Sequence, residues 1–107
     1  MEIEERQVDD ATILHLKGRM LIGEGTELLR EKFDGLVEAG RTRIALDLGD
    51  VPYVDSAGLG EMVRCYKTMG RKDGSFKLFN TPKRIRDLLA TARLLVVTGE
   101  DDEDWPS

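Results

Sequence analysis

The sequence predicts an α/β fold, in which a mixed sheet of about five strands, parallel in its centre, has three or more helices packed against it. Two observations carry this prediction. Short apolar segments alternate with longer segments in which apolar residues recur every three or four positions, the spacing of one buried helical face. The expected order is strand, strand, helix, strand, helix, strand, helix, strand, and strand–helix–strand units place their strands in parallel.

The length and charge of the chain predict one domain and a tail. With 107 residues, the chain suits a single domain. Five of its 21 acidic residues form the run 100–104, and the other 16 balance the 16 basic residues. Such a neutral body lacks the basic surplus of a nucleic-acid-binding protein, so we expect no direct contact with nucleic acid. We expect a domain at 1–99 and an acidic, flexible tail at 100–107, because like charges resist collapse.

Cysteine usage and the start of the chain favour a cytoplasmic protein. Cys65 is the only cysteine, which excludes a disulfide within the chain and favours a reducing compartment. The first residues are acidic and lack the apolar stretch of a secretory signal. No apolar run approaches the ~18 residues that span a bilayer. We therefore expect a soluble, cytoplasmic protein without membrane insertion.

The N-terminal part of the chain predicts a β-hairpin. Residues 2–8 alternate weakly, as an edge strand does, and residues 12–17 form the returning strand after a turn at Asp9 and Asp10. His15, the only histidine, lies in the second strand with no cysteine or second histidine nearby. We interpret it as a structural or exposed residue rather than a metal ligand.

The first helix follows a loop at 19–25. Its apolar residues repeat with a helical period and are Leu28, Leu29, Phe33, Leu36 and Val37. Gly40 then supplies a stop signal. Two interpretations remain open for the apolar loop residues Met20, Leu21 and Ile22: burial where the chain crosses the sheet edge, or contact with a partner.

The centre of the chain contains an apolar strand followed closely by a helix. The strand covers 44–48 and leads into a loop with Gly49 and Pro52. The helix begins at Asp55 and Ser56, both preferred capping residues, because a short side-chain oxygen accepts from free backbone N–H groups. Its apolar residues are Leu59, Met62, Val63, Tyr66 and Met69. We expect Ser56 to be exposed at this helix start, beyond the carboxyl end of a buried strand, where binding sites of open α/β sheets collect.

The last predicted elements are a strand, a helix and a short strand. A turn at 72–75 precedes the strand 76–79, and Thr81 and Pro82 predict a helix cap and a first helical turn. The residues expected on the buried side of this helix are Ile85, Leu88, Leu89 and Ala92. On its outer side lie the cations Lys83, Arg84 and Arg86. We interpret these cations as a solvated helix face, with a partner patch as the alternative, and place the last strand at 94–97.

Catalytic and cofactor motifs are incomplete. Residues 35–42 have the spacing of a phosphate-binding loop, but they close a helix instead of following a strand. Ser56 lacks the Gly-x-Ser-x-Gly elbow, and His15 has no evident route to it. Three aspartates precede or flank this serine, Asp47, Asp50 and Asp55. With no acidic pair after the first strand, they are more simply loop or cap residues than a phosphoacceptor and Mg²⁺ site, and we expect no enzyme, cofactor or metal.

Two segments of the chain resemble a known family. Val-Asp-Ser-Ala-Gly-Leu-Gly at 54–60, preceded by Ile-Ala-Leu-Asp-Leu at 44–48, resembles the signature of STAS domains, most closely that of the bacterial anti-sigma factor antagonists. The resemblance covers residues 1–98 and implies a STAS-type fold. In this family the serine of the motif, here Ser56, is phosphorylated by a partner kinase that is itself the anti-sigma factor.

The resemblance implies a function in partner switching. The unphosphorylated protein would bind an anti-sigma factor with serine kinase activity and so regulate transcription indirectly. Phosphorylation of Ser56 would end this binding, and a phosphoserine phosphatase would restore it. The implied partner-binding residues of the motif are Asp55, Ser56, Ala57, Gly58, Leu59 and Gly60. Those of the loop beside it are Leu21, Ile22, Gly23 and Glu24.

Alternatives remain open for the serine, the glycines and the whole domain. Ser56 could serve only as a helix cap. If Ser56 is instead the phosphorylated residue, as the resemblance implies, Asp55 is its capping and orienting neighbour. Gly58 and Gly60 suit close approach by a partner, or tight packing within the domain. The chain could also be a STAS scaffold subunit of a larger sensory (stressosome-like) or membrane transport assembly. The residues do not determine the oligomeric state.

Overall fold

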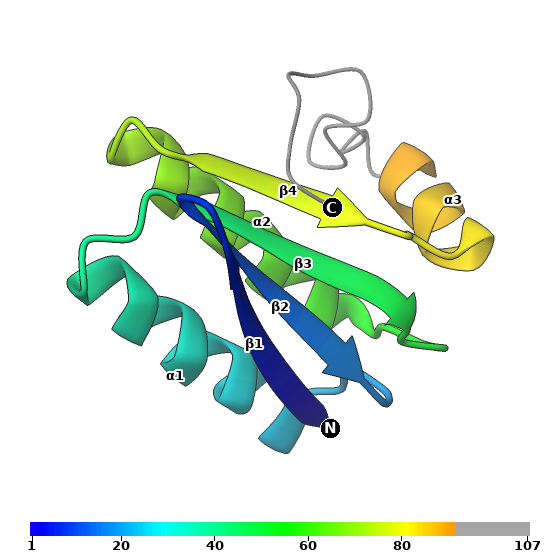
Figure 1. Ribbon diagram of the computed structural model, residues 1–107. Coiled ribbons are helices and arrows are strands. Elements are labelled where there is room, and N and C mark those ends of the chain that lie inside the picture. Colours follow the sequence, from blue (N-terminus) through cyan, green and yellow to red (C-terminus); the bar gives the residue numbers. More distant parts are fainter. Residues whose placement is uncertain (92–107) are drawn as a thin grey trace.

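A computed structural model, which describes residues 1–91, shows helices packed on a mixed sheet (Figure 1). The elements are β1 (Glu2–Val8), β2 (Ala11–Lys17), α1 (Glu24–Glu38), β3 (Arg43–Asp50), α2 (Ser56–Arg71), β4 (Ser75–Phe79) and α3 (Lys83–Thr91). The strand order is β1-β2-β3-β4, with β1 antiparallel to β2 and the other neighbours parallel. The predicted α/β fold with a mixed sheet is confirmed.

Part of the sequence prediction lies outside the described residues. This part comprises Ala92, the strand at 94–97 and the tail at 100–107. The described residues therefore contain the first four of the about five expected strands. The boundary between the domain and its acidic tail stays a prediction.

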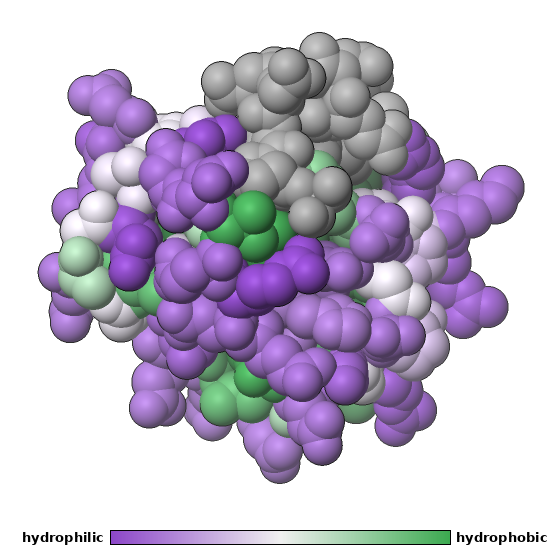
Figure 2. Space-filling model, viewed as in Figure 1, coloured by the Kyte–Doolittle hydropathy of each residue, from purple (hydrophilic) through white to green (hydrophobic). Residues whose placement is uncertain are grey.

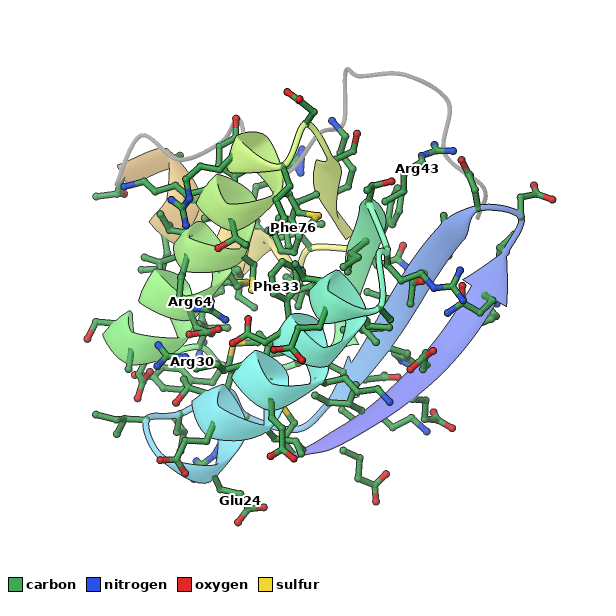
Figure 3. The ribbon with its side chains drawn as sticks, turned by 90° about the vertical axis from the view of Figure 1, so that its left-hand side faces the viewer. Glu24, Arg30, Phe33, Arg43, Arg64 and Phe76 are labelled. Atoms are coloured by element: carbon green, nitrogen blue, oxygen red, sulfur yellow. The ribbon has the colours of Figure 1, made fainter. Side chains whose placement is uncertain are left out.

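The core lies between the sheet and α1 and α2, which cover one of its faces (Figures 1 and 3). Every strand except the edge strand β1 contributes fully buried side chains or nearly so. Phe33 of α1 and Phe76 of β4 meet edge to face, with ring centroids 5.9 Å apart. Such a contact joins helix to sheet in the middle of the core.

The opposite side of the molecule is mostly polar. In Figure 2 hydrophilic residues dominate the visible face, and hydrophobic residues form only small patches. Ion pairs join the edge strand β1 to its neighbours: Glu4 binds Lys17 of β2, and Glu5 binds Lys32 of α1, each at 2.8 Å. Within residues 1–91, no helix has the length and apolar character needed to cross a bilayer.

The largest differences from the predicted elements are in α3. Thr81 does not cap this helix: its hydroxyl is buried without a hydrogen-bond partner, and Pro82 directly precedes the first helical residue. Leu88 is 40% exposed, because the short helix buries only a narrow stripe with Ile85 and Leu89. Of the three cations, Lys83 and Arg84 are exposed, and Arg86 is half-buried.

Two other element boundaries also shift. β3 continues through Gly49 to Asp50, since it pairs with β2 as far as Lys17. The first helix begins at Glu24, before the predicted end of the loop, and Gly23 precedes it with a positive φ of 97° that glycine tolerates best. Leu28, at 36% exposed, lies at the margin of the apolar stripe of α1.

Candidate functional site

The parallel pairing of β2 and β3 brings two distant segments together. Both strands end at the same edge of the sheet, and from there the chain leads into α1 and α2 (Figure 1). Backbone hydrogen bonds join the two connecting segments: Met20 N–H donates to the Tyr53 carbonyl at 2.9 Å, and Asp55 N–H donates to the Met20 carbonyl at 3.1 Å. Residues 20 and 54 form an isolated parallel bridge. The loop before α1 therefore lies against the start of α2.

Asp55, and not Ser56, caps α2. The Oδ1 atom of Asp55 accepts from Gly58 N–H at 2.8 Å, and its extended backbone conformation is that of a capping residue. Ser56 is the first residue of the helix and is exposed, as predicted. No hydrogen bond among the described residues engages its hydroxyl group. The interpretation of Ser56 as the cap is therefore wrong, and its hydroxyl is free for other chemistry.

The second carboxylate oxygen of Asp55 binds the neighbouring loop. Its Oδ2 atom accepts from Ile22 N–H at 2.9 Å. Backbone N–H groups of Ile22 and Gly58, in that order, lower the pKa of Asp55, because they stabilise the charged form. One carboxylate therefore connects the loop before α1 to the first turn of α2.

The three apolar residues of this loop divide between the two predicted environments. Met20 is fully buried in the core, and Leu21 is half-buried. Ile22 is 76% exposed, more than any other large apolar side chain of the described residues. Burial is therefore the right interpretation for Met20, and exposure beside Ser56 for Ile22.

Gly58 does not belong to an accessible surface. It is buried, and a Cβ atom there would lie 2.8 Å from the Met20 carbonyl oxygen and 2.8 Å from Val54 Cγ1. Of the two interpretations of Gly58, the structure favours packing inside the domain, since its missing side chain makes room there. Gly60 is exposed, with nothing within 4 Å of an added Cβ.

The remaining predicted contact residues surround Ser56 to different degrees. Ala57 and Leu59 are half-buried, and Leu59 packs against the core. Gly23 is half-buried and Glu24 is exposed. We use the term Ser56 surface for the accessible parts of residues 21–24, 55–57 and 60.

The sequence analysis missed a buried carboxylate, that of Glu61 in α2. Its side chain is 2% exposed and binds two guanidinium groups: Arg30 Nη2 at 3.0 Å and Arg64 Nη2 at 2.7 Å. Arg64 also reaches Asp34 at 3.0 Å and lies over the Phe33 ring, and Figure 3 shows Arg30 and Arg64 between the two helices. The spacing of Glu61 and Arg64, three residues apart on a helix, was the available signal.

Two residues beside Glu61, Arg64 and Cys65, have shifted pKa values. Hydrogen bonds from Arg64 to Glu61 raise the pKa of the Arg64 guanidinium. Burial, followed by the charge of Glu61, raises the pKa of the Cys65 thiol, which holds it in the uncharged form. Cys65 is thus an unreactive core residue in this fold.

The histidine and the other aspartates have structural partners of their own. His15 Nε2 lies 2.8 Å from Asp50 Oδ2 on the sheet, which agrees with a structural role. Asp47 accepts from Gly49 N–H at 3.0 Å and from Asn80 Nδ2 at 3.1 Å. In residues 1–91 no three His, Cys, Asp or Glu side chains are grouped so that they could hold a metal ion.

Sequence comparisons identify relatives of the chain. The family model of the STAS domain matches residues 2–102. The anti-sigma-B factor antagonist of Bacillus subtilis (strain 168) is 39% identical over 75 residues, which make up 70% of this chain and 62% of that protein. The match thus spans less than two thirds of that relative's length.

Solved structures share the fold. A proposed anti-sigma factor antagonist from Thermotoga maritima is 28% identical, with a TM-score of 0.83 over 90% of this chain and 82% of that one. The anti-sigma factor antagonist SpoIIAA in its unphosphorylated form is 19% identical, with a TM-score of 0.72 over 83% and 82% of the two chains. Its phosphorylated form, from Bacillus, is 18% identical, with a TM-score of 0.75 over 91% and 88%. At these identities, the likeness to SpoIIAA shows the fold alone.

Proposed function

The chain belongs to the STAS domain family, and from this we propose that it is an anti-sigma factor antagonist, a binding protein switched by phosphorylation of Ser56. In its unphosphorylated state it binds an anti-sigma factor that has serine kinase activity. This binding frees a sigma factor and so regulates transcription indirectly. The names of the relatives from Bacillus subtilis and Thermotoga maritima support this function.

The observation that carries the proposal is the separation of roles between Asp55 and Ser56. Asp55 supplies the cap of α2, so the fold does not need the Ser56 hydroxyl. Ser56 is exposed at a helix start, where free N–H groups and the positive end of the helix dipole stabilise an added phosphate. The domain can therefore be modified at this position and stay folded.

The phosphate acts on binding through charge and size. A phosphoserine adds roughly −1.5 to −2 charges and three strong hydrogen-bond acceptors. It would stand beside the carboxylate of Asp55, which raises the density of negative charge on the Ser56 surface. A partner fitted to a neutral hydroxyl group then meets added bulk and a dianion that is costly to desolvate. One modification therefore releases the partner.

The proposed function also assigns the other components of the pathway. The Ser56 surface forms the contact with the anti-sigma factor kinase, and a phosphoserine phosphatase restores binding. We propose that the protein itself is not an enzyme, since within residues 1–91 no base or orienting group forms a hydrogen bond with Ser56. We place the protein in the cytoplasm, where transcription takes place.

A capture experiment with ATP tests this function. Wild-type chain, Ser56→Ala and Ser56→Asp serve as baits in native lysate, and the intact mass of each recovered bait is measured. We expect the wild type to gain one phosphate and Ser56→Ala none, because Ser56 is the acceptor. Before ATP is added, wild type and Ser56→Ala should retain a kinase-type partner that Ser56→Asp does not bind. Addition of ATP should then release this partner from the wild type and leave it on Ser56→Ala.

Thr91→Ala is the matched control, since it removes an exposed hydroxyl group from α3. It should bind and gain phosphate as the wild type does. A partner retained equally by all four baits, with no added phosphate, would contradict the switch. That result would favour the second candidate, a STAS scaffold subunit in which the Ser56 surface is a permanent contact.

A further inference from the structure

The loop that carries Ile22 is held by an unusual continuation of parallel strand pairing. Two backbone hydrogen bonds join this loop to the segment before α2: Met20 N–H donates to the Tyr53 carbonyl, and Asp55 N–H donates to the Met20 carbonyl. In a regular parallel pair, Ile22 N–H would donate next to the backbone carbonyl of Asp55. That carbonyl already accepts from Leu59 N–H at 2.9 Å, as the first bond of α2. The backbone carbonyl of Asp55 is therefore engaged by the helix.

The side chain of Asp55 replaces its backbone carbonyl in the pairing. Oδ2 accepts from Ile22 N–H at 2.9 Å, while Oδ1 accepts from Gly58 N–H at 2.8 Å. The negative charge makes both bonds stronger than those to a neutral acceptor. The backbone of Ile22 is thus bound to Asp55, the residue directly before Ser56, although the Ile22 side chain is 76% exposed.

We propose that Asp55 is a positioning residue that holds Ile22 as a preformed apolar anchor beside Ser56. The partner is the kinase-type anti-sigma factor of the proposed function, on which this inference rests. Its binding surface has an apolar pocket for the branched side chain of Ile22, next to the group that recognises the Ser56 hydroxyl. A fixed backbone lowers the entropy cost of binding, and an apolar anchor filling a pocket carries a large share of an interface's affinity.

In this arrangement one loop residue and one helix residue both contribute to the binding of the same partner. Ile22 supplies affinity and Ser56 supplies control, while Asp55 sets the distance between them. A phosphate on Ser56 then brings charge against the edge of an apolar contact, where water is excluded and desolvation is most costly.

The position of Ile22 is tested first without any partner. Asn is as good a helix cap as Asp, but it has one acceptor oxygen, so Asp55→Asn can keep only one of the two bonds. As the cap of α2 it should keep the bond from Gly58 and lose the one from Ile22. We expect amide hydrogen exchange of Ile22, measured by NMR on the full chain, to become at least about tenfold faster in Asp55→Asn. The Leu59 amide should stay protected. Unchanged exchange at Ile22 would overturn the positioning role.

The anchor is tested by affinity for the captured kinase. Ile22→Ala should weaken binding by about tenfold or more, and Ile22→Val should stay within about threefold of the wild type. Leu88→Ala, which shortens another exposed apolar side chain, is the control and should bind normally. Since Asp55 acts through Ile22, adding Asp55→Asn to Ile22→Ala should cost at most about threefold more.

The outcomes separate the anchor from the proposed function. Wild-type affinity in Ile22→Ala overturns the anchor and leaves the phosphorylation switch standing. Multiplying effects in the double variant overturn the action of Asp55 through Ile22. If no bait captures a kinase, the proposed function fails and the anchor with it, while faster exchange of Ile22 in Asp55→Asn still supports the positioning role.

Discussion

At the scale of single residues, two glycines of α2 have opposite surroundings. Gly58 faces the Met20 carbonyl and Val54, each 2.8 Å from an added Cβ, whereas Gly60 has open space. Both are in the same helix, so their backbone preferences are alike. The surroundings alone therefore decide the effect of adding a methyl group at each position.

Alanine at the two positions should have opposite effects on stability. Gly58→Ala forces the loop at Met20 away from the helix and should lower the free energy of unfolding by about 1–3 kcal/mol. Gly60→Ala removes backbone freedom from the unfolded chain and should raise it by about 0.5–1 kcal/mol. Urea denaturation of both variants measures this difference. Equal effects would contradict the packing described for Gly58.

The carboxylate of Asp55 makes stability depend on pH. Its pKa is lowered in the folded state by the N–H groups of Ile22 and Gly58. The stabilisation is therefore present above its unfolded pKa of about 3.9 and is lost as the pH falls through the lower, folded value. Asp55→Asn lacks this titration.

We expect the stability difference between wild type and Asp55→Asn to be largest near neutral pH and to shrink below about pH 4. Urea unfolding of both proteins at several pH values between about 3 and 7 gives the comparison. The other acidic residues are the same in both proteins, so their contributions cancel in the difference between wild type and Asp55→Asn. A difference that stays constant with pH would show that the Asp55 carboxylate is not specifically stabilised.

At the scale of elements, the Glu61 network joins α1 to α2. The carboxylate is buried, while its partners Arg30 and Arg64 are 60% and 30% exposed. The helices carry the two sides of the Ser56 surface, since α1 begins at Glu24 and α2 at Ser56. Their relative position thus depends on a contact outside the surface itself.

Glu61→Gln should lower the free energy of unfolding by about 1–3 kcal/mol, because a neutral amide satisfies two guanidinium groups poorly. Asp87→Asn is the matched control. It breaks an ion pair with Lys83 whose side chains are 87% and 63% exposed, and it should cost less than about 0.5 kcal/mol. Thermal and urea unfolding measure both variants. A loss no larger in Glu61→Gln than in Asp87→Asn would contradict a stabilising role of the network.

At the scale of the whole molecule, the Ser56 surface exists only in the folded chain. Ile22 and Asp55 are 33 positions apart and meet because β2 and β3 run parallel and end together. A peptide of residues 50–62 contains the motif but lacks the loop, and a helix of this length is marginal in water.

This peptide should not compete for the captured kinase, even at about 100-fold excess over the full chain. The full chain is the positive control and should compete at equal concentration. A competition binding assay with labelled wild-type chain measures both. Effective competition by the peptide would show that the partner recognises a linear motif and would contradict recognition of the folded surface.

Local sequence signals predicted the elements well, and the errors have physical causes. Apolar periodicity located all helices and strands of the described residues, because it reports on one buried face at a time. Thr81 and Pro82 had the local signature of a helix start, but the hydroxyl group of Thr81 is buried without a partner. Leu88 fitted the helical period, yet α3 is too short to bury it.

The site was predicted in its position and only partly in its contacts. The motif placed Ser56 correctly at an exposed helix start. Two adjacent capping residues left the identity of the cap open, since Asp55 and Ser56 have similar preferences. Gly58 was assigned to the surface because glycine suits both close approach and internal packing. Glu61 was missed, since its contact with Arg30 lies 31 positions away.

The sequence by itself determined the order of the described elements and the exposed serine at the start of α2, because helix periods, strand alternation and capping act over a few neighbouring residues. The resemblance of the motif at 54–60 indicated the family. Only the tertiary structure decided that the Asp55 carboxylate binds Ile22, that Gly58 packs under Met20 and that Glu61 joins two helices. These contacts depend on which strands pair and in what register, which no short segment specifies.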